Sequence, residues 1–435
     1  MPGSFITALS GLRGASAAID AIGNNLANLN TVGFKASGVS FQDVVAAVTG
    51  ASSHQIGSGV ASPQVLKQFV QGSIQTTRGS ADAAIQGDGF FVVRAADSGS
   101  SASISDPTTS LYTRAGNFRI DQTGILVTAT GERVQGWSLN TLTGQLNTSD
   151  PIGDIIVPVG TNRAARATTS INANLNLDAS ATTGSTFAVP FNIYDSLGNA
   201  HVISATFTKQ AAVNTWNASI SSTDPTVTAI APSGPWVFKF NTSGGLDTVS
   251  GTGYNATTGD IEGIGLTLTN GAVTPLKVNW SPWQVVPAGT PLVGVGRLSQ
   301  FAQPSASSSI FQNGLPAAQL VNVSVGDGGA VLAQYSNGSQ QEVARLTLAS
   351  VRNPDTLVST GNNNYRTGVG TAIPVVGIAA TGGRGTIVGG ALESSNVDIA
   401  EEFTKLIIYQ RAYSANARVI TTTDEISQET INLKR

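Results

Sequence analysis

The two ends of this chain carry amphipathic helical patterns, and their placement constrains the fold more than any other feature of the sequence. In the first thirty residues, apolar side chains recur at alternating steps of three and four, which is the spacing of one narrow stripe on an α-helix. Arg13 and Asp20 are the only charges before Lys35. Because an isolated helix of this kind is marginal in water, we expect it to pack against another element. The stripe consists of Leu12, Ala15, Ile19, Ile22, Leu26 and Leu29.

The C-terminal segment predicts a second helix, from about residue 397 to 433. Ser395 and Asp398 have the spacing of a capping box, and Glu401 and Glu402 place negative charge in the first turn. At 1.5 Å per residue this helix is roughly 55 Å long, which is more than a compact β-domain covers. We therefore expect the two terminal helices to pair as a coiled coil and to bury their stripes on neighbouring copies. The second stripe consists of Ile399, Phe403, Leu406, Gln410, Tyr413, Ala417 and Ile420.

The region between the helices reads almost entirely as strands and turns. Residues 84–86 and 90–93 flank Gly87-Asp88-Gly89 and predict a tight hairpin, and further hairpins are predicted around 195–199, 326–329 and 336–339. The fold class is therefore mainly β with helical termini, built from two or more antiparallel β-domains of the barrel or sandwich type. Aromatic residues suited to the core of the central domain are Trp216, Trp236, Phe238, Phe240 and Trp280.

Proline-containing turns divide the chain into nested domains, in which early and late segments belong together. Asp150-Pro151 precedes the central block, and Pro282, Pro287 and Pro291 follow it. The conformation of residues 366–390 stays open. The expected division is a terminal helical domain (1–35 with 391–435), an extended linking segment (36–80 with 360–390), an inner β-domain (81–147 with 292–359) and an outer β-domain (148–291).

The composition excludes several classes of function. Charged residues make up 11% of the chain, and the net charge of −3 offers no basic field for nucleic acid. Cysteine is absent, which excludes disulfides and thiolate metal sites. The N-terminus lacks the basic leader and apolar core of a cleaved signal peptide, and no stretch reads as a membrane span, so we expect no membrane insertion.

The residues that commonly carry catalysis are scarce. His54 and His201 are the only histidines, and we interpret them as a loop residue and a strand-edge residue. Asp88, Asp121 and Asp327 lie beside glycines, where turn chemistry explains them. We therefore expect no enzyme activity, no metal and no cofactor.

Several motifs resemble the flagellar rod and hook protein family. Asn24 to Lys35 is similar to the N-terminal motif of that family, while Leu392 to Phe403 and Gln410 to Ile420 are similar to its C-terminal motif. Gln86 to Phe91 and Tyr112 to Phe118 resemble its first β-domain. The resemblance implies polymerisation through the terminal helices. The assembly residues expected from the N-terminal motif, beyond the stripe, are Asn24, Asn25, Asn28, Thr31, Gly33 and Phe34.

Within this family the large central block favours a hook protein over a distal rod protein, and a β-rich secreted adhesin is an alternative from another class. A hook protein implies a curved, torque-transmitting homopolymer outside the cell, exported through the flagellar type III apparatus without a cleaved signal peptide. The family also implies contacts with the hook cap, the distal rod and the hook–filament junction proteins.

Overall fold

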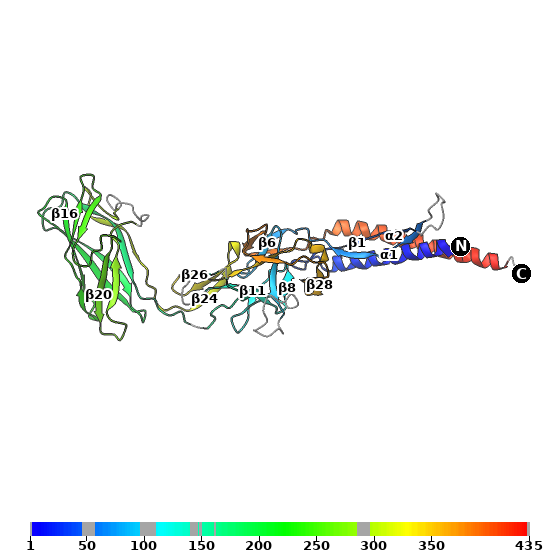
Figure 1. Ribbon diagram of the computed structural model, residues 1–435, viewed down its shortest axis with the longest axis horizontal. Helices are drawn as coiled ribbons and strands as arrows, with labels where there is room; N and C mark the ends of the chain where they lie inside the picture. The colour runs from blue at the N-terminus through cyan, green and yellow to red at the C-terminus, as the bar shows by residue number, and fades with distance from the viewer. Residues whose placement is uncertain are drawn as a thin grey trace. The chain divides into compact units, whose positions relative to one another are not determined.

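The computed structural model describes residues 2–45, 57–95, 110–139, 147, 150–160, 162–284 and 296–432. These residues form two compact units, and the chain leaves the first unit and later returns to it. Unit 1 combines Met1–Val159 with Val321–Arg435, and unit 2 is Gly160–Leu320. Figure 1 shows the helices and the first sheet in unit 1 and the second group of strands in unit 2.

The terminal helices α1 (Pro2–Ala27) and α2 (Ile399–Asn432) lie side by side in unit 1 (Figure 1). Asn25 of α1 meets Glu402 of α2, whereas Gly11 lies against Asn416, so the two helices run antiparallel. Pairing of the terminal helices is therefore confirmed. By length and composition alone α1 could also cross a membrane, contrary to the expectation that no segment is apolar enough, but its contacts in this structure are with α2 and nearby strands.

The start of α2 differs from the predicted capping box. Asp398 is the N-cap residue, because its Oδ1 accepts hydrogen bonds from the backbone N–H groups of Ala400 and Glu401 at 2.8 and 3.0 Å. Ser395 instead accepts a hydrogen bond from the N–H of Val397 in the preceding turn. The helix therefore begins with Ile399, one turn later than a Ser395 cap implies.

Within the described residues, thirteen strands of unit 1 form one sheet with the central order β24-β25-β26-β11-β7-β8-β29-β28. The predicted hairpins β24–β25 and β25–β26 are present. The predicted hairpin at residues 84–93 is wrong, because β6 pairs with the distant β31 and β7 pairs with β8. The helical end also carries the small pairs β1–β4, β2–β3 and β5–β32.

The strands of unit 1 have the following bounds: β1 (Ser37–Ser40), β2 (Asp43–Val45), β3 (Gly57–Val60), β4 (Gln64–Lys67), β5 (Ile74–Thr76), β6 (Ala83–Gln86), β7 (Phe90–Arg94), β8 (Ser110–Thr113), β9 (Arg119–Ile120), β10 (Leu126–Val127), β11 (Arg133–Ser138), β12 (Gly153–Asp154), β24 (Leu320–Val325), β25 (Ala330–Tyr335), β26 (Gln340–Leu346), β27 (Leu348–Ser350), β28 (Val358–Gly361), β29 (Asn364–Arg366), β30 (Val375–Gly377), β31 (Thr386–Gly389) and β32 (Ala391–Glu393).

Residues 360–390 do not form the extended linking segment that the sequence suggested. They contribute β29 and β30, which pair with β8 and β27 of the thirteen-stranded sheet, and β31, which forms a separate two-stranded sheet with β6. Small residues and glycines made this stretch look irregular, but its backbone N–H and C=O groups are satisfied by strand pairing. β29, β30 and β31 therefore all lie in unit 1.

Unit 2 is a sandwich of a five-stranded sheet (β14-β15-β16-β18-β19) and a six-stranded sheet (β17-β20-β21-β13-β22, with β23 on β13), counted over its described residues. The sequence placed this domain at 148–291, but β22 and β23 pair with β13 and extend it to Leu320. Pro287 and Pro291, which suggested the earlier boundary, lie outside the described residues. β13 is parallel to both β21 and β22, so the sandwich is not wholly antiparallel.

The core of unit 2 lies between the two sheets. Side chains alternate between buried and partly exposed along β13 and β15, which is the pattern of a half-buried strand. Trp280 packs edge-on against Trp236 with ring centroids 6.0 Å apart. All five aromatic residues predicted for this core are buried.

The strands of unit 2 have the following bounds: β13 (Ser170–Asp178), β14 (Thr186–Tyr194), β15 (Ala200–Lys209), β16 (Thr215–Ser222), β17 (Val227–Ala231), β18 (Trp236–Phe240), β19 (Leu246–Ser250), β20 (Ile261–Leu268), β21 (Leu276–Trp280), β22 (Leu298–Phe301) and β23 (Ala306–Gln312).

Candidate assembly surface and the buried junction beside it

Small side chains line the face of α1 that contacts α2. A Cβ atom added to Gly11 would lie 2.9 Å from Nδ2 of Asn416, so the two helices approach closely at this point. Buried residues follow Gly11 at steps of three and four, the spacing of one helix face. This row consists of Ala8, Gly11, Ala15, Ala18, Ile22 and Asn25.

Asn25 joins three segments at the end of α1. Its Nδ2 donates to Glu402 Oε2 on α2 and to the carbonyl oxygen of Ser37, both at 2.9 Å. Its Oδ1 accepts the N–H of Ser37 at 2.8 Å. Lys405 supplies a charge partner for Glu402, with Nζ 3.0 Å from Oε1. This predicted assembly residue is therefore completely satisfied inside its own chain.

A buried ionic junction connects the helices to the inner sheet. Lys35 Nζ lies 2.6 Å from Glu393 Oε1, and Arg114 Nη1 lies 3.2 Å from Glu393 Oε2. The side chains of Lys35 and Glu393 are both 0% exposed. Burial lowers the pKa of the Lys35 ammonium, and the neighbouring carboxylate of Glu393 opposes this shift. The junction thus joins three segments that are far apart in sequence.

Backbone and amide contacts reinforce this junction. The N–H of Gly33 donates to the carbonyl oxygen of Glu393 at 2.8 Å, and Asn396 Oδ1 accepts the N–H of Ala36 at 2.7 Å. Gly33 has a φ of +66°, and a Cβ there would lie 2.6 Å from the backbone of Ala115. Only glycine fits both the conformation and the space at this position.

The predicted assembly residues fall into three classes of exposure. Buried ones are Ala15, Ile22, Asn25, Gly33 and Phe34; partly buried ones are Leu12, Ile19, Leu26, Asn28, Leu29, Thr31, Leu406, Ala417 and Ile420; exposed ones are Asn24, Ile399, Phe403 and Tyr413.

The exposed members of the predicted α2 stripe do not face α1. Glu402 contacts α1, and Phe403 is the next residue, so Phe403 points just over a quarter of a turn away. The exposed fractions are 53% for Ile399, 51% for Phe403 and 40% for Tyr413. Together with Leu406 and Ala417 these side chains form an apolar strip beside the contact with α1, which we call the lateral strip.

Sequence reasoning did not select the residues that form the ionic junction or those that fasten α2. Glu393, Asn396 and Arg114 lie within the motifs that resemble the family. For Glu402 the sequence predicts only a negative charge in the first helical turn. The low number of charged residues could have indicated this junction. In so charge-poor a chain, an ionisable residue beside apolar residues or glycines is a candidate for a buried ion pair.

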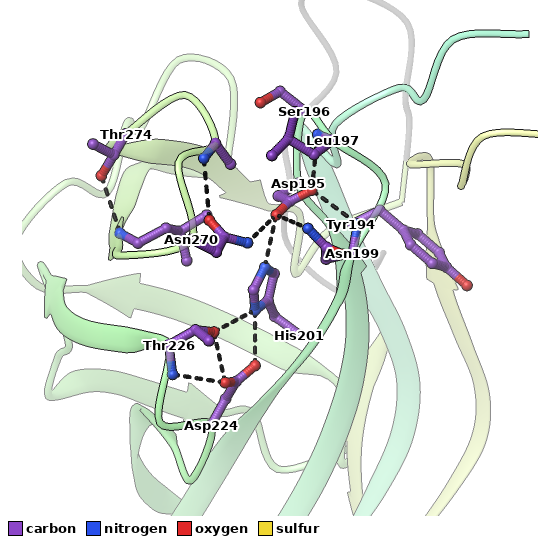
Figure 2. Close-up of polar contacts among 12 residues, drawn as sticks. Tyr194, Asp195, Ser196, Leu197, Asn199, His201, Asp224, Thr226, Asn270 and Thr274 are labelled. Carbon is purple, nitrogen blue, oxygen red and sulfur yellow. Dashed lines mark hydrogen bonds and ion pairs between the residues drawn. The ribbon is translucent and has the colours of Figure 1, made fainter.

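A second buried polar cluster lies in unit 2 (Figure 2). His201 Nδ1 is 2.7 Å from Asp224 Oδ2, and its Nε2 is 3.1 Å from Asp195 Oδ2. Asn270 and Asn199 also donate to Asp195 Oδ2. Despite burial, these hydrogen bonds hold the pKa of Asp195 well below its usual range. His201 is therefore a buried link between the two sheets, and its interpretation as a strand-edge residue is wrong.

Two of the three carboxylates considered for catalysis, those of Asp121 and Asp327, accept backbone hydrogen bonds. Asp121 Oδ1 accepts the N–H groups of Thr123 and Ile125, both at 2.8 Å, and so closes a turn. Asp327 Oδ1 accepts the N–H of Gly389, and the backbone oxygen of Asp88 accepts that of Gly385. No group of three or more metal-ligating side chains occurs in the described part of the chain. His54 lies outside the described residues.

Four family models match separate segments of the chain. They are "Flagella basal body rod protein" (residues 5–35), "Flagellar hook protein FlgE/F/G D1 domain" (84–174), "Flagellar basal body protein FlaE D2 domain" (161–315) and "Flagellar basal body rod FlgEFG protein C-terminal" (388–433). The first match includes most of α1, the last includes α2, and the third covers most of unit 2.

Curated relatives match over their full length. The flagellar hook protein FlgE of Borreliella burgdorferi is 30% identical over 458 residues, covering 99% of both chains. The FlgE proteins of Salmonella typhimurium and Escherichia coli are each 30% identical, over 449 and 446 residues, covering 99% of this chain and 100% of theirs. The crystal structure of Helicobacter pylori FlgE2 aligns with a TM-score of 0.49 at 13% identity, covering 72% of this chain and 99% of that one.

These relatives are structural proteins and not enzymes, and they do not favour the distal rod or adhesin alternatives. From the full-length identity and the ordered set of domain matches, the chain belongs to the flagellar hook protein FlgE family and is a structural subunit of the bacterial flagellar hook.

Proposed function

We propose that the subunit joins its polymer through the terminal helical domain, residues 1–35 and 391–435, with the lateral strip of α2 packing on a neighbouring copy. The observation that carries this proposal is the exposure of Ile399, Phe403 and Tyr413 after α1 has covered one face of α2. Burying a large apolar side chain contributes about 1.5–3 kcal/mol, so an uncovered strip of this length favours association. Before assembly the helices are disordered, and they fold on joining the polymer.

The finer features of the proposal follow from family membership. The polymer is a curved tube outside the cell that transmits torque from rod to filament. Its partners are the distal rod, the hook cap and the hook–filament junction proteins. Export occurs through the flagellar type III apparatus without a cleaved signal peptide.

A charge on the lateral strip tests the assembly mode. Phe403→Asp and Tyr413→Asp should each raise the critical concentration for polymerisation of the full-length subunit by at least about tenfold, because loss of about 1.4 kcal/mol changes an equilibrium constant tenfold. Sedimentation of the polymer and swimming motility are the two measurements. Tryptophan fluorescence checks that unit 2 remains folded, since it holds four of the five tryptophans.

Ser414→Asp is the matched control, because Ser414 is also exposed on α2 but lies outside the lateral strip. It should polymerise like the unmodified chain. Wild-type polymerisation of Phe403→Asp and Tyr413→Asp would contradict the proposal. Retained assembly after deletion of residues 1–35, and separately of 397–435, would contradict any role of the helices in polymerisation.

A further inference from the structure

A polar pocket lies where the end of α1 meets the inner sheet of unit 1. Its cavity volume is about 290 Å³. Asn28 and Thr31 from the end of α1 form one side, and loops of the β-domain form the rest. The β-domain contributes Thr128, Thr130, Asn363 and Asn364, among others. The pocket is therefore rich in amide and hydroxyl groups.

The carboxylate of Glu132 is buried next to the pocket, where it accepts hydrogen bonds from lining residues that include Thr128, Thr130 and Asn364. Glu132 is 8% exposed, and its Oε2 accepts hydrogen bonds from the hydroxyls of Thr128 and Thr130. Its Oε1 accepts Nδ2 of Asn364 at 2.8 Å and Nδ2 of Asn362 at 3.5 Å. Burial favours the neutral acid, but these hydrogen bonds hold the pKa of Glu132 below its usual value. Glu132 is consequently ionised at neutral pH.

Glu132 differs from other buried carboxylates of unit 1 in its partners. Glu393 and Glu402 each form an ion pair with a lysine or arginine, whereas every partner of Glu132 within the described residues is neutral. The hydrogen bonds keep the carboxylate ionised, but no positive charge in the ranges that the structure describes neutralises it, so a cation brought close to it is attracted.

Among the described residues, the side-chain amides of Asn362, Asn363 and Asn364, close to Glu132, use their Nδ2 atoms as donors but not their Oδ1 atoms as acceptors. Asn362 and Asn364 direct their Nδ2 atoms at Glu132, and Asn363 directs its Nδ2 at the carbonyl oxygen of Val32 at 2.9 Å. In the described part of the chain, no hydrogen bond reaches the Oδ1 atom of any of the three. The pocket thus presents unused acceptors in front of an anion. Lysine and arginine, which only donate hydrogen bonds and carry positive charge, have the complementary chemistry.

We propose that this pocket receives a lysine or arginine side chain from a neighbouring copy of the chain in the polymer. A second copy is the fitting source because no cation of the described residues pairs with Glu132 within one chain, and because the pocket adjoins the end of the helix pair. The inference rests on the proposed polymerisation through that helix pair.

Glu132→Gln in the full-length subunit is the test, since glutamine keeps the shape and an acceptor oxygen but removes the charge. The melting temperature of the isolated subunit should fall, because glutamine accepts weaker hydrogen bonds than the ionised carboxylate. Independently of this, the critical concentration of polymerisation should increase about tenfold or more. Raising the salt concentration should weaken the unmodified polymer more than the variant. Glu342→Gln is the control, because Glu342 already pairs with Arg345 in its own chain and should leave assembly unchanged.

The donor can be identified by removing exposed basic residues one at a time. Arg13→Gln, Arg119→Gln, Arg352→Gln and Arg366→Gln are the first set, each exposed in the subunit. Substitution of one basic residue, in this set or among the remaining lysines and arginines, should reproduce the assembly defect. Combined with Glu132→Gln, that substitution should cause no further increase in the critical concentration.

A Glu132→Gln subunit that melts at a lower temperature but assembles normally would show that Glu132 acts only within its own fold, and would overturn the inference. If Phe403→Asp blocks assembly while Glu132→Gln does not, the inference fails and the proposed polymerisation stands. If Phe403→Asp assembles normally, the proposed polymerisation itself fails.

Discussion

At the junction of helices and sheet, Glu393 is the carboxylate that faces both Lys35 and Arg114. Glu393→Gln leaves these two cations buried without a full counter-charge, so we expect the free energy of unfolding to fall by about 3–5 kcal/mol. Urea unfolding followed by circular dichroism measures this. Glu342→Gln should cost less than about 1 kcal/mol, because the Glu342–Arg345 pair is partly exposed. Equal effects of the two substitutions would mean that the junction is not an ionic anchor.

The motifs located most residues of this junction but not its contacts. Lys35, Arg114 and Glu393 occur in three separate motifs of the sequence, and nothing in their spacing states that they meet. A local pattern predicts which residues share a turn or a helix face. Contacts between residues 35 and 393 depend on the whole fold, so only the structure reveals that these charges neutralise one another.

Close approach of α1 and α2 depends on residues without bulk, and Gly11 is the test position at the scale of the element. Gly11→Leu should push the helices apart, because even a Cβ there would crowd Asn416. Overpacking of this kind costs about 1–3 kcal/mol. The temperature at which the assembled polymer dissociates should fall accordingly.

Gly23→Leu is the matched substitution on the same helix, where a Cβ would meet nothing within 4 Å. Leucine favours helix over glycine by up to about 1 kcal/mol, so this polymer should be unchanged or more stable. If both variants lose stability equally, close packing at Gly11 is not the cause.

Apolar periodicity predicted both helices but did not identify the face of α2 that contacts α1. The contact face of α1 contains Ala8, Gly11 and Ala18, which are small and add little to an apolar pattern. Larger residues such as Phe403 dominated the pattern and lie to the side. Similarly, Gly87–Gly89 predicted a hairpin between its flanking strands, whereas β6 pairs with β31, about three hundred residues later. Non-local pairing is not encoded in local spacing.

At the scale of the whole molecule, the division into two units predicts separate responses to acid. The pKa of Asp195 is lowered in the folded state, so its contribution is present above the unfolded carboxyl pKa of about 3.9 and is lost as pH falls below it. Unit 2 should therefore lose stability below about pH 4. His201, Asn199 and Asn270 face this carboxylate, and Asp224 faces His201.

Asp195→Asn should destabilise unit 2 by about 2 kcal/mol at neutral pH and should flatten its acid dependence, since hydrogen bonds to a charged group are worth about 1.5–3 kcal/mol. Tryptophan fluorescence of the full chain follows this unit. Asp247→Asn, a partly exposed position on β19, is the control and should keep the acid dependence of the unmodified chain. An unchanged acid profile in Asp195→Asn would assign the acid sensitivity to other groups.

The contact between Lys35 and Glu393 also determines when the buried junction can form in a chain that emerges N-terminus first. Lys35 emerges early, and its partner follows only after more than three hundred further residues. Until that late segment arrives, Lys35 and Arg114 lack the carboxylate that joins them. A truncated chain that lacks Glu393 cannot form this ion pair. Only the full-length chain can therefore complete the buried junction.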